Sequence, residues 1–100
     1  MRRAAKVDGN QERIVEAFRA AGCSVQSLAA IGHGCPDLLC AINGYTFLVE
    51  IKDCAQAPSK RRLTPMQKDW HAEWHGKVHL VETVDAALFI AGQYRHRKAA

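Results

Sequence analysis

Two acidic residues and one lysine are the groups in this sequence most able to do chemistry together. Asp37 is followed, after 12 intervening residues, by Glu50, and Lys52 comes two positions later. Two carboxylates and a neighbouring backbone carbonyl form a hard oxygen site of the kind that suits Mg²⁺ or Mn²⁺. An ammonium group beside such a metal can orient an attacking water and stabilise charge on a phosphate. The three residues therefore indicate metal-assisted phosphate chemistry.

A predicted hairpin brings the two acids together. The residues on either side of Asn43-Gly44 are apolar and strand-prone, and this pair favours a type I′ turn because both residues tolerate a positive φ. A two-residue turn also fixes the register of the two strands, and this register places Asp37 opposite Glu50.

Like charges opposed across an antiparallel pair are destabilising unless something compensates them. Lys52 lies on the same strand face as Glu50 and can offset part of this repulsion. Two interpretations are open at this point. The group is either a structural salt bridge at a strand end, with solvent screening the second carboxylate, or a metal site.

The rest of the chain supplies the elements that position these groups. We predict a helix over about 11–21 capped by Asn10, strands over about 24–31, 37–42 and 45–52, a helix from a capping box at Thr64 and Gln67 to about 75, a strand over about 77–82 and a last helix capped by Thr83. The strands before and after the crossover helix should be parallel. The predicted fold class is α/β, a mixed sheet with the order helix, three strands, helix, strand, helix.

Length and composition predict a single domain over residues 1–100, because two halves would each be too short to build a core. No apolar run approaches the roughly 18 residues of a membrane span, and no secretory signal is evident. The sequence therefore predicts an intracellular, cytoplasmic protein with its four cysteines reduced.

The formal net charge of +4 is unevenly distributed along the chain. Three runs each carry +3, and the remaining residues are acidic overall. The first run is Arg2, Arg3 and Lys6, and the last is Arg95, Arg97 and Lys98. The middle run contains Lys52, Lys60, Arg61 and Arg62, with Asp53 subtracting one charge. Basic extensions of this kind favour a polyanionic partner, although exposed lysines and arginines also simply keep a small domain soluble.

The residues around the acids resemble a known family. Gly34-Cys35-Pro36-Asp37 followed by Glu50-Ile51-Lys52 resembles the PD-(D/E)xK motif of the restriction-endonuclease-like nucleases. Leu63-Thr64-Pro65-Met66-Gln67 resembles the leucine-to-glutamine signature at the start of the next helix in the VRR-NUC branch. Small phage-borne members of that branch, and Holliday junction resolvase relatives, are of this length. The resemblance covers about residues 11–90.

The resemblance implies a restriction-endonuclease-like core and a role for each matching residue. Asp37 and Glu50 are the expected ligands of Mg²⁺ or Mn²⁺, and the carbonyl of Ile51 is a further ligand. Lys52 is the expected catalytic lysine. Gln67 is expected near that lysine in the active site, a role that it can combine with its place in the capping box.

The family also has an acidic residue on its first helix. Glu12 and Glu16 are one helical turn apart and either can fill this role, with Glu12 favoured by its distance from Gly22. For DNA contacts we expect the basic run Lys60-Arg61-Arg62, which joins the Glu50 strand to the Gln67 helix. His33, in the glycine-rich loop before Asp37, is a further candidate for phosphate binding.

Two histidines and two tryptophans later in the chain are weaker candidates for functional residues. His71 and His75 lack the order of a zinc-binding helix and are interpreted as solvated or packed. Trp70 and Trp74, at helical spacing, are interpreted as core or interface rather than as a base-stacking platform.

We therefore predict a Mg²⁺-dependent DNA endonuclease that prefers branched DNA such as flaps or Holliday junctions. The alternatives are a non-catalytic nucleic-acid-binding module that retains the fold and a structural partner subunit. A homodimer is also expected, because paired nicks need two active sites. Four large aromatic residues late in the chain, Trp70, Trp74, Phe89 and Tyr94, exceed the needs of a small core and are candidates for a subunit interface.

Overall fold

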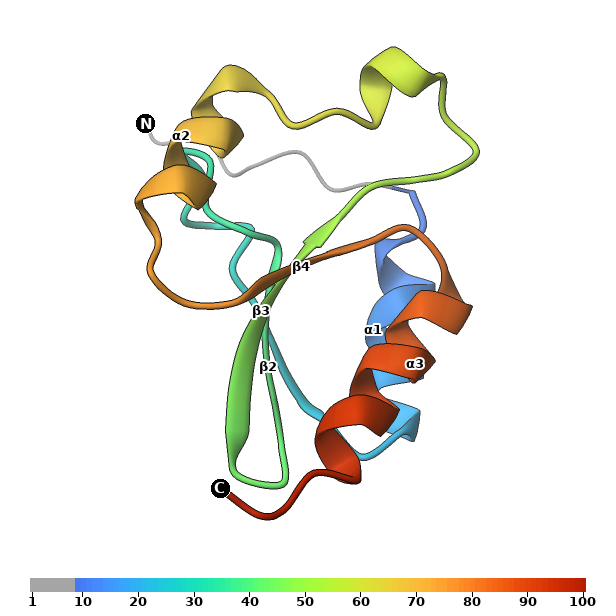
Figure 1. The fold of residues 1–100 in the computed structure, drawn as a ribbon. Helices are drawn as coiled ribbons and strands as arrows, with labels where there is room; N and C mark the ends of the chain where they lie inside the picture. Colours follow the sequence, from blue (N-terminus) through green and yellow to red (C-terminus); the bar gives the residue numbers. More distant parts are fainter. Residues whose placement is uncertain (1–8) are drawn as a thin grey trace.

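Residues 9–100 are described by the computed structural model and form three α-helices and one four-stranded sheet (Figure 1). The elements are α1 (Gln11–Ala20), β1 (Ser24–Ser27), β2 (Leu38–Ile42), β3 (Tyr45–Ile51), a short 3-10 helix η1 (Pro58–Lys60), α2 (Pro65–Glu73), β4 (Val78–Val81) and α3 (Val84–Arg95). This order is the one predicted from the sequence, with η1 added. The basic run of Arg2, Arg3 and Lys6 lies outside the described residues.

The sheet has the strand order β1-β2-β3-β4 and is mixed, as predicted. β1, β2 and β3 pair antiparallel, and β3 pairs parallel with β4 across the α2 crossover. The hairpin turn has positive φ at Asn43 (55°) and Gly44 (80°). Leu38 pairs with Val49, so the predicted register is confirmed. Asp37 lies one residue before this last pair, at the end of the hairpin that also holds Glu50.

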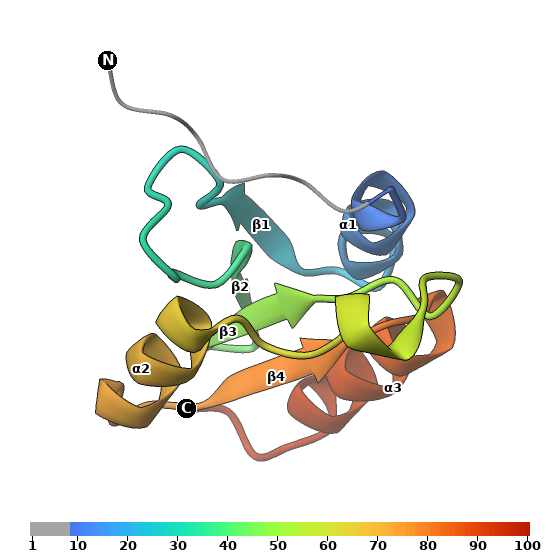
Figure 2. The same cartoon turned by 90° about the horizontal axis from the view of Figure 1, so that it is seen from above.

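Helices cover both faces of the sheet (Figure 2). α1 and α3 lie together on one side and α2 lies on the other. The apolar core lies between the sheet and the α1–α3 pair. It is formed by Ile14, Ala17, Phe18, Cys23, Leu38, Cys40, Phe47, Val49, Ile51, Val81, Ala87, Ala91 and Tyr94. No residue of α2 is buried, so this helix contributes nothing to that core.

Two of the three predicted caps have the expected side-chain bonds. Thr64 and Gln67 form the reciprocal capping box of α2, and the Thr83 side chain accepts from Ala86 N at the start of α3. Asn10 occupies the N-cap position of α1 but makes no side-chain capping bond. Its Nδ2 instead donates to the carbonyls of Lys52 (3.2 Å) and Glu82 (2.9 Å), because this buried amide lies against the ends of β3 and β4.

Two further differences from the sequence predictions concern β1 and Tyr94. β1 stops at Ser27, whereas the predicted strand continued to residue 31. The chain turns there, and Ile31 N donates to Leu28 O. Tyr94 is 6% exposed and stacks on Phe47 at 4.4 Å between ring centroids. It is therefore a core residue, so Tyr94 is not among those of the four aromatic candidates that could face a partner subunit.

Candidate active site

Gln67 connects the two predicted catalytic side chains on β3 and the loop after it. Its Oε1 accepts from Lys52 Nζ at 2.9 Å, and its Nε2 donates to Glu50 Oε2 at 3.2 Å. The same Oε1 also accepts from Thr64 N at 2.9 Å, which is one half of the capping box. The two roles expected for Gln67 are therefore combined in one side chain. The start of α2 is attached by these bonds to the end of β3.

Strand alternation explains why Glu50 and Lys52 point toward α2. Phe47, Val49 and Ile51 enter the core on the α1–α3 side, so the residues between and after them face the other way. Glu50 is 1% exposed and Lys52 is 6% exposed. Burial of both charges is tolerable only because each has polar partners, since an isolated buried charge is very costly.

Asp37 directly precedes β2, the other strand of the hairpin, and is also buried, with 7% exposure. Its Oδ2 accepts from Ile51 N at 2.6 Å. This bond ties Asp37 to the backbone between Glu50 and Lys52. The structure therefore brings together the three residues of the predicted motif and Gln67.

His71 is a site residue that sequence reasoning missed. Its Nε2 lies 3.7 Å from Glu50 Oε1, and burial lowers the pKa of His71, with the positive charge of Lys52 lowering it further. The available signal was its position one helical turn after Gln67, which places both side chains on the same face of α2.

The glycine-rich loop before Asp37 packs directly against the first turn of α2. A Cβ at Gly34 would lie 2.5 Å from the Met66 carbonyl oxygen, and Gly34 has a φ of +83°. Only glycine fits this contact and this backbone conformation. Burial raises the pKa of the neighbouring Cys35 thiol, and the negative charges of Glu50 and Asp37 raise this pKa further.

The donor set fits a hard divalent cation that keeps several waters. Asp37 and Glu50 supply carboxylate oxygens, and Mg²⁺ is usually held by one or two such groups. Within residues 9–100 no cluster of three or more His, Cys, Asp or Glu side chains is arranged to hold a metal. Glu12 therefore does not join Asp37 and Glu50 in such a cluster. It lies on an exposed position of α1, as does Glu16.

The predicted DNA-binding residues lie on the surface around this end of the sheet. Lys60 and Arg62 are exposed, whereas Arg61 is half-buried with its Nη1 3.9 Å from Glu82 Oε1. Glu82 directly follows β4, whose partner strand carries Glu50. His33 is exposed and has a positive φ of 55°. Contacts of these residues with phosphate remain a prediction.

None of the helices within residues 9–100 is both long and apolar enough to cross a bilayer. No protein-family model, curated protein or solved structure matches this chain. The family resemblance therefore depends on the sequence motifs alone.

Proposed function

We propose that this protein is a Mg²⁺-dependent DNA endonuclease with a restriction-endonuclease-like core. The observation that carries the proposal is the Gln67 side chain, which bonds to both Lys52 and Glu50 at the buried end of β3. A structural salt bridge needs no third group that orients both partners. A catalytic lysine does need such a group, because its ammonium must be held where charge develops in the transition state.

Asp37 and Glu50 would hold the metal ion, with the Ile51 carbonyl beside them. Mg²⁺ at this position would polarise the scissile phosphate and lower the pKa of the attacking water. Lys52, held by Gln67 Oε1, would stabilise the negative charge that develops on the phosphate. Asp37 additionally fixes the backbone of Ile51 through its hydrogen bond, so the carbonyl and the two neighbouring side chains keep a common orientation.

The basic residues outside the site support a nucleic-acid substrate. Lys60 and Arg62 are exposed on the segment that joins β3 to α2, and His33 is exposed on the loop before Asp37. These exposed groups are available to the phosphates of a bound nucleic acid. Arg61 is less available, because Glu82 lies beside its guanidinium.

The test is a panel of end-labelled linear, flapped and four-way DNAs, incubated with the protein and either Mg²⁺ or EDTA. We expect cleavage in Mg²⁺ only, fastest on branched DNA, and none with the Asp37→Asn protein. Cleavage that continues in EDTA would remove the metal mechanism. DNA binding without cleavage in Mg²⁺ would instead favour the non-catalytic binding module.

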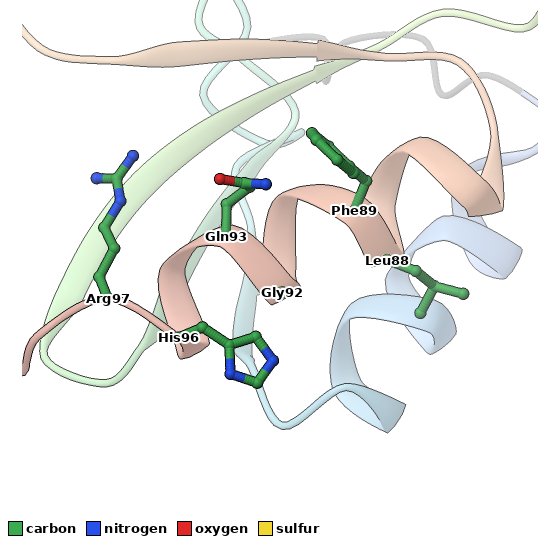
Figure 3. Close-up of a pocket in the computed structure, with 6 residues that line it drawn as sticks. All are labelled: Leu88, Phe89, Gly92, Gln93, His96 and Arg97. Atoms are coloured by element: carbon green, nitrogen blue, oxygen red, sulfur yellow. The ribbon is translucent and has the colours of Figure 1, made fainter.

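A homodimer belongs to the same proposal, because a twofold axis would relate two active sites to the two nicks of a four-way junction. The outer surface of α3 supports it. Phe89 is 67% exposed and Leu88 is 45% exposed, and they border a hollow of about 460 Å³ that also includes Gln93 and His96 (Figure 3). Figure 3 shows Phe89 and Gln93 on one side of the helix and Leu88 and His96 on the other. Light scattering should give twice the chain mass of 11.1 kDa, and a mass of one chain would contradict the dimer.

A further inference from the structure

A second concave surface lies on the α2 side of the sheet, beside the candidate active site. This groove has a volume of about 330 Å³ and is almost entirely apolar. It lies between β2, β3 and the end of α2. Its lining includes Cys35, Leu39, Leu48, Trp70, Trp74 and Lys77.

The two tryptophans form one stacked pair on α2, and they are not part of the core. Their ring centroids are 4.8 Å apart and their planes differ by 20°. Trp74 is 48% exposed, and neither ring belongs to the buried cluster on the other side of the sheet. The interpretation of Trp70 and Trp74 was core or interface, and their absence from the buried cluster excludes the core half of it. A large aromatic surface beside a concave site instead indicates a ligand.

The backbone holds Trp74 in place. A Cβ at Gly76 would lie 2.7 Å from Trp74 Nε1, so the glycine allows the indole to lie directly against the chain that leads to β4. The ring is thus pre-oriented at the mouth of the groove. A pre-oriented aromatic face binds a planar ligand with little loss of conformational entropy.

Three elements that line the groove also carry or adjoin residues of the candidate active site. Leu48 and Glu50 are two residues apart on β3, so they lie on the same face of the strand and are separated by about 7 Å along it. His71 follows Trp70 in α2, and its Nε2 lies 3.7 Å from Glu50 Oε1. Cys35 lines the groove and precedes Asp37 by two residues in the same loop. A ligand that reaches Glu50 can therefore extend into the groove.

Size and charge identify the occupant. The groove has room for one planar ring system, whereas a subunit interface buries about 800 Å² on each partner. Lys77 lines the groove and provides a cation for an anionic group attached to that ring. In a DNA substrate the planar ring attached to the phosphate backbone is a nucleobase, and its face can stack on an aromatic side chain. A base in a duplex is stacked and paired, so only an unpaired base is free to enter.

We propose that this groove binds one unpaired nucleobase of the DNA strand whose phosphate lies at Glu50 and Lys52, stacked on the Trp70–Trp74 pair. The inference rests on the proposed nuclease function and specifies its substrate class. DNA with an unpaired nucleotide next to the scissile bond is preferred over uninterrupted duplex. Flaps and the strand-exchange point of a junction both offer such a nucleotide.

The intrinsic fluorescence of the protein tests this directly, because its two tryptophans both line the groove. The probe is a hairpin duplex with a short oligothymidine tail, compared with the same duplex with a blunt end, both titrated in EDTA so that no cleavage occurs. We expect the tailed duplex to quench tryptophan fluorescence and to bind about tenfold more tightly than the blunt one. This ratio corresponds to about 1.4 kcal/mol, within the range for one base stacked on an aromatic ring.

Trp74→Ala should reduce the tailed duplex to the affinity of the blunt one, and Trp74→Phe should retain most of the preference. His75→Ala is the matched control, because His75 is the next residue, is exposed and does not line the groove. Equal affinities of the wild-type protein for both duplexes, or an unchanged preference in Trp74→Ala, would overturn the proposal. Concentration-dependent changes in tryptophan emission without DNA, together with equal affinities, would show that a second copy covers the groove.

The outcome for the nuclease function is separate from this result. Metal-dependent cleavage without tail-dependent quenching would reject the base-binding groove and leave the nuclease standing. Tail-dependent quenching that is lost in Trp74→Ala, without cleavage in Mg²⁺, would retain the groove and reject the nuclease.

Discussion

The two faces of the sheet are built on different principles, although one strand supplies both. On the α1–α3 side, Phe47 and Val49 are buried among apolar side chains of two helices. On the α2 side, Glu50 is equally buried but has polar partners, and α2 has no buried residue of its own. The first face stabilises the domain through apolar burial. The second positions charged groups, and its helix is attached by hydrogen bonds and one close backbone contact.

The largest effect should come from the apolar face. Phe18 is fully buried and its ring lies 6.0 Å from that of Phe47. Phe18→Ala should lower the free energy of unfolding by about 3–5 kcal/mol, because it leaves a cavity that cannot collapse. Urea denaturation measures this loss. Met66→Ala, on exposed α2 surface, should change stability by no more than about 0.5 kcal/mol. Equal losses in the two variants would remove the distinction between the faces.

Substitutions on the α2 side of the sheet should affect DNA cleavage more than stability. Lys52→Ala should lower the cleavage rate by about 10²–10³-fold, the usual cost of one group that stabilises transition-state charge, while DNA affinity changes little. Lys68→Ala is the matched control, because Lys68 is an exposed lysine of α2. Single-turnover cleavage assays compare the two. A normal rate for Lys52→Ala would reduce this lysine to a structural counter-ion.

The contact between Gly34 and α2 should be the most sensitive structural point of the site face. Gly34→Ala forces a Cβ to within 2.5 Å of Met66 O at a positive φ, and we expect a stability loss of about 1–3 kcal/mol and slower cleavage. Gly92→Ala is the control, because a Cβ there meets nothing within 4 Å in α3. It should stabilise the protein by about 0.5–1 kcal/mol. Full activity of Gly34→Ala would mean that α2 need not dock in this way.

A comparison of substitutions at Gln67 and Thr64 distinguishes the role of Gln67 in capping α2 from its proposed role in catalysis. Either Thr64→Ala or Gln67→Ala removes part of the capping box and should cost about 1 kcal/mol of stability. Only Gln67→Ala also removes the bonds to Lys52 and Glu50, so only this variant should lose cleavage activity beyond its stability loss. Parallel denaturation and cleavage measurements show the difference. Equal activity losses would indicate that Gln67 acts only through the helix.

The smallest expected effect is a pH dependence of stability that arises from His79 on the apolar face. His79 Nε2 lies 2.8 Å from Tyr94 Oη, and burial lowers the pKa of His79, with smaller contributions from Lys77 and Arg97. The unfolded chain therefore takes up the proton first as pH falls below the ordinary value of 6.5. Stability should be complete above that pH and decline below it.

His79→Gln should flatten this decline when urea denaturation is compared above and below pH 6.5. His71, whose pKa is lowered in the same direction, is present in both proteins, so the difference between them isolates His79. An identical pH dependence in the variant would assign the decline to other groups.

Local sequence patterns determined the hairpin and its register, the order of elements, the parallel pairing of β3 with β4 and the caps at Thr64 and Thr83. The β3–β4 pairing follows from the crossover connection between the two strands. The other features depend on residues close in the chain: two residues that tolerate positive φ, alternating apolar side chains, and hydroxyls that bond three positions away. The same local patterns were enough to bring Asp37, Glu50 and Lys52 to one end of the sheet, because a fixed register leaves them no other place.

The tertiary structure alone decided which helix faces meet this sheet end. Asn10 bonds to Lys52 O instead of capping α1, His71 approaches Glu50, and the tryptophans of α2 lie outside the core. The first two are contacts between residues far apart in sequence, and the third follows from the position of the apolar core on the α1–α3 side of the sheet. With that core complete, α2 was left with a polar connection to the site and an exposed aromatic groove, an outcome that no single segment of the chain encodes.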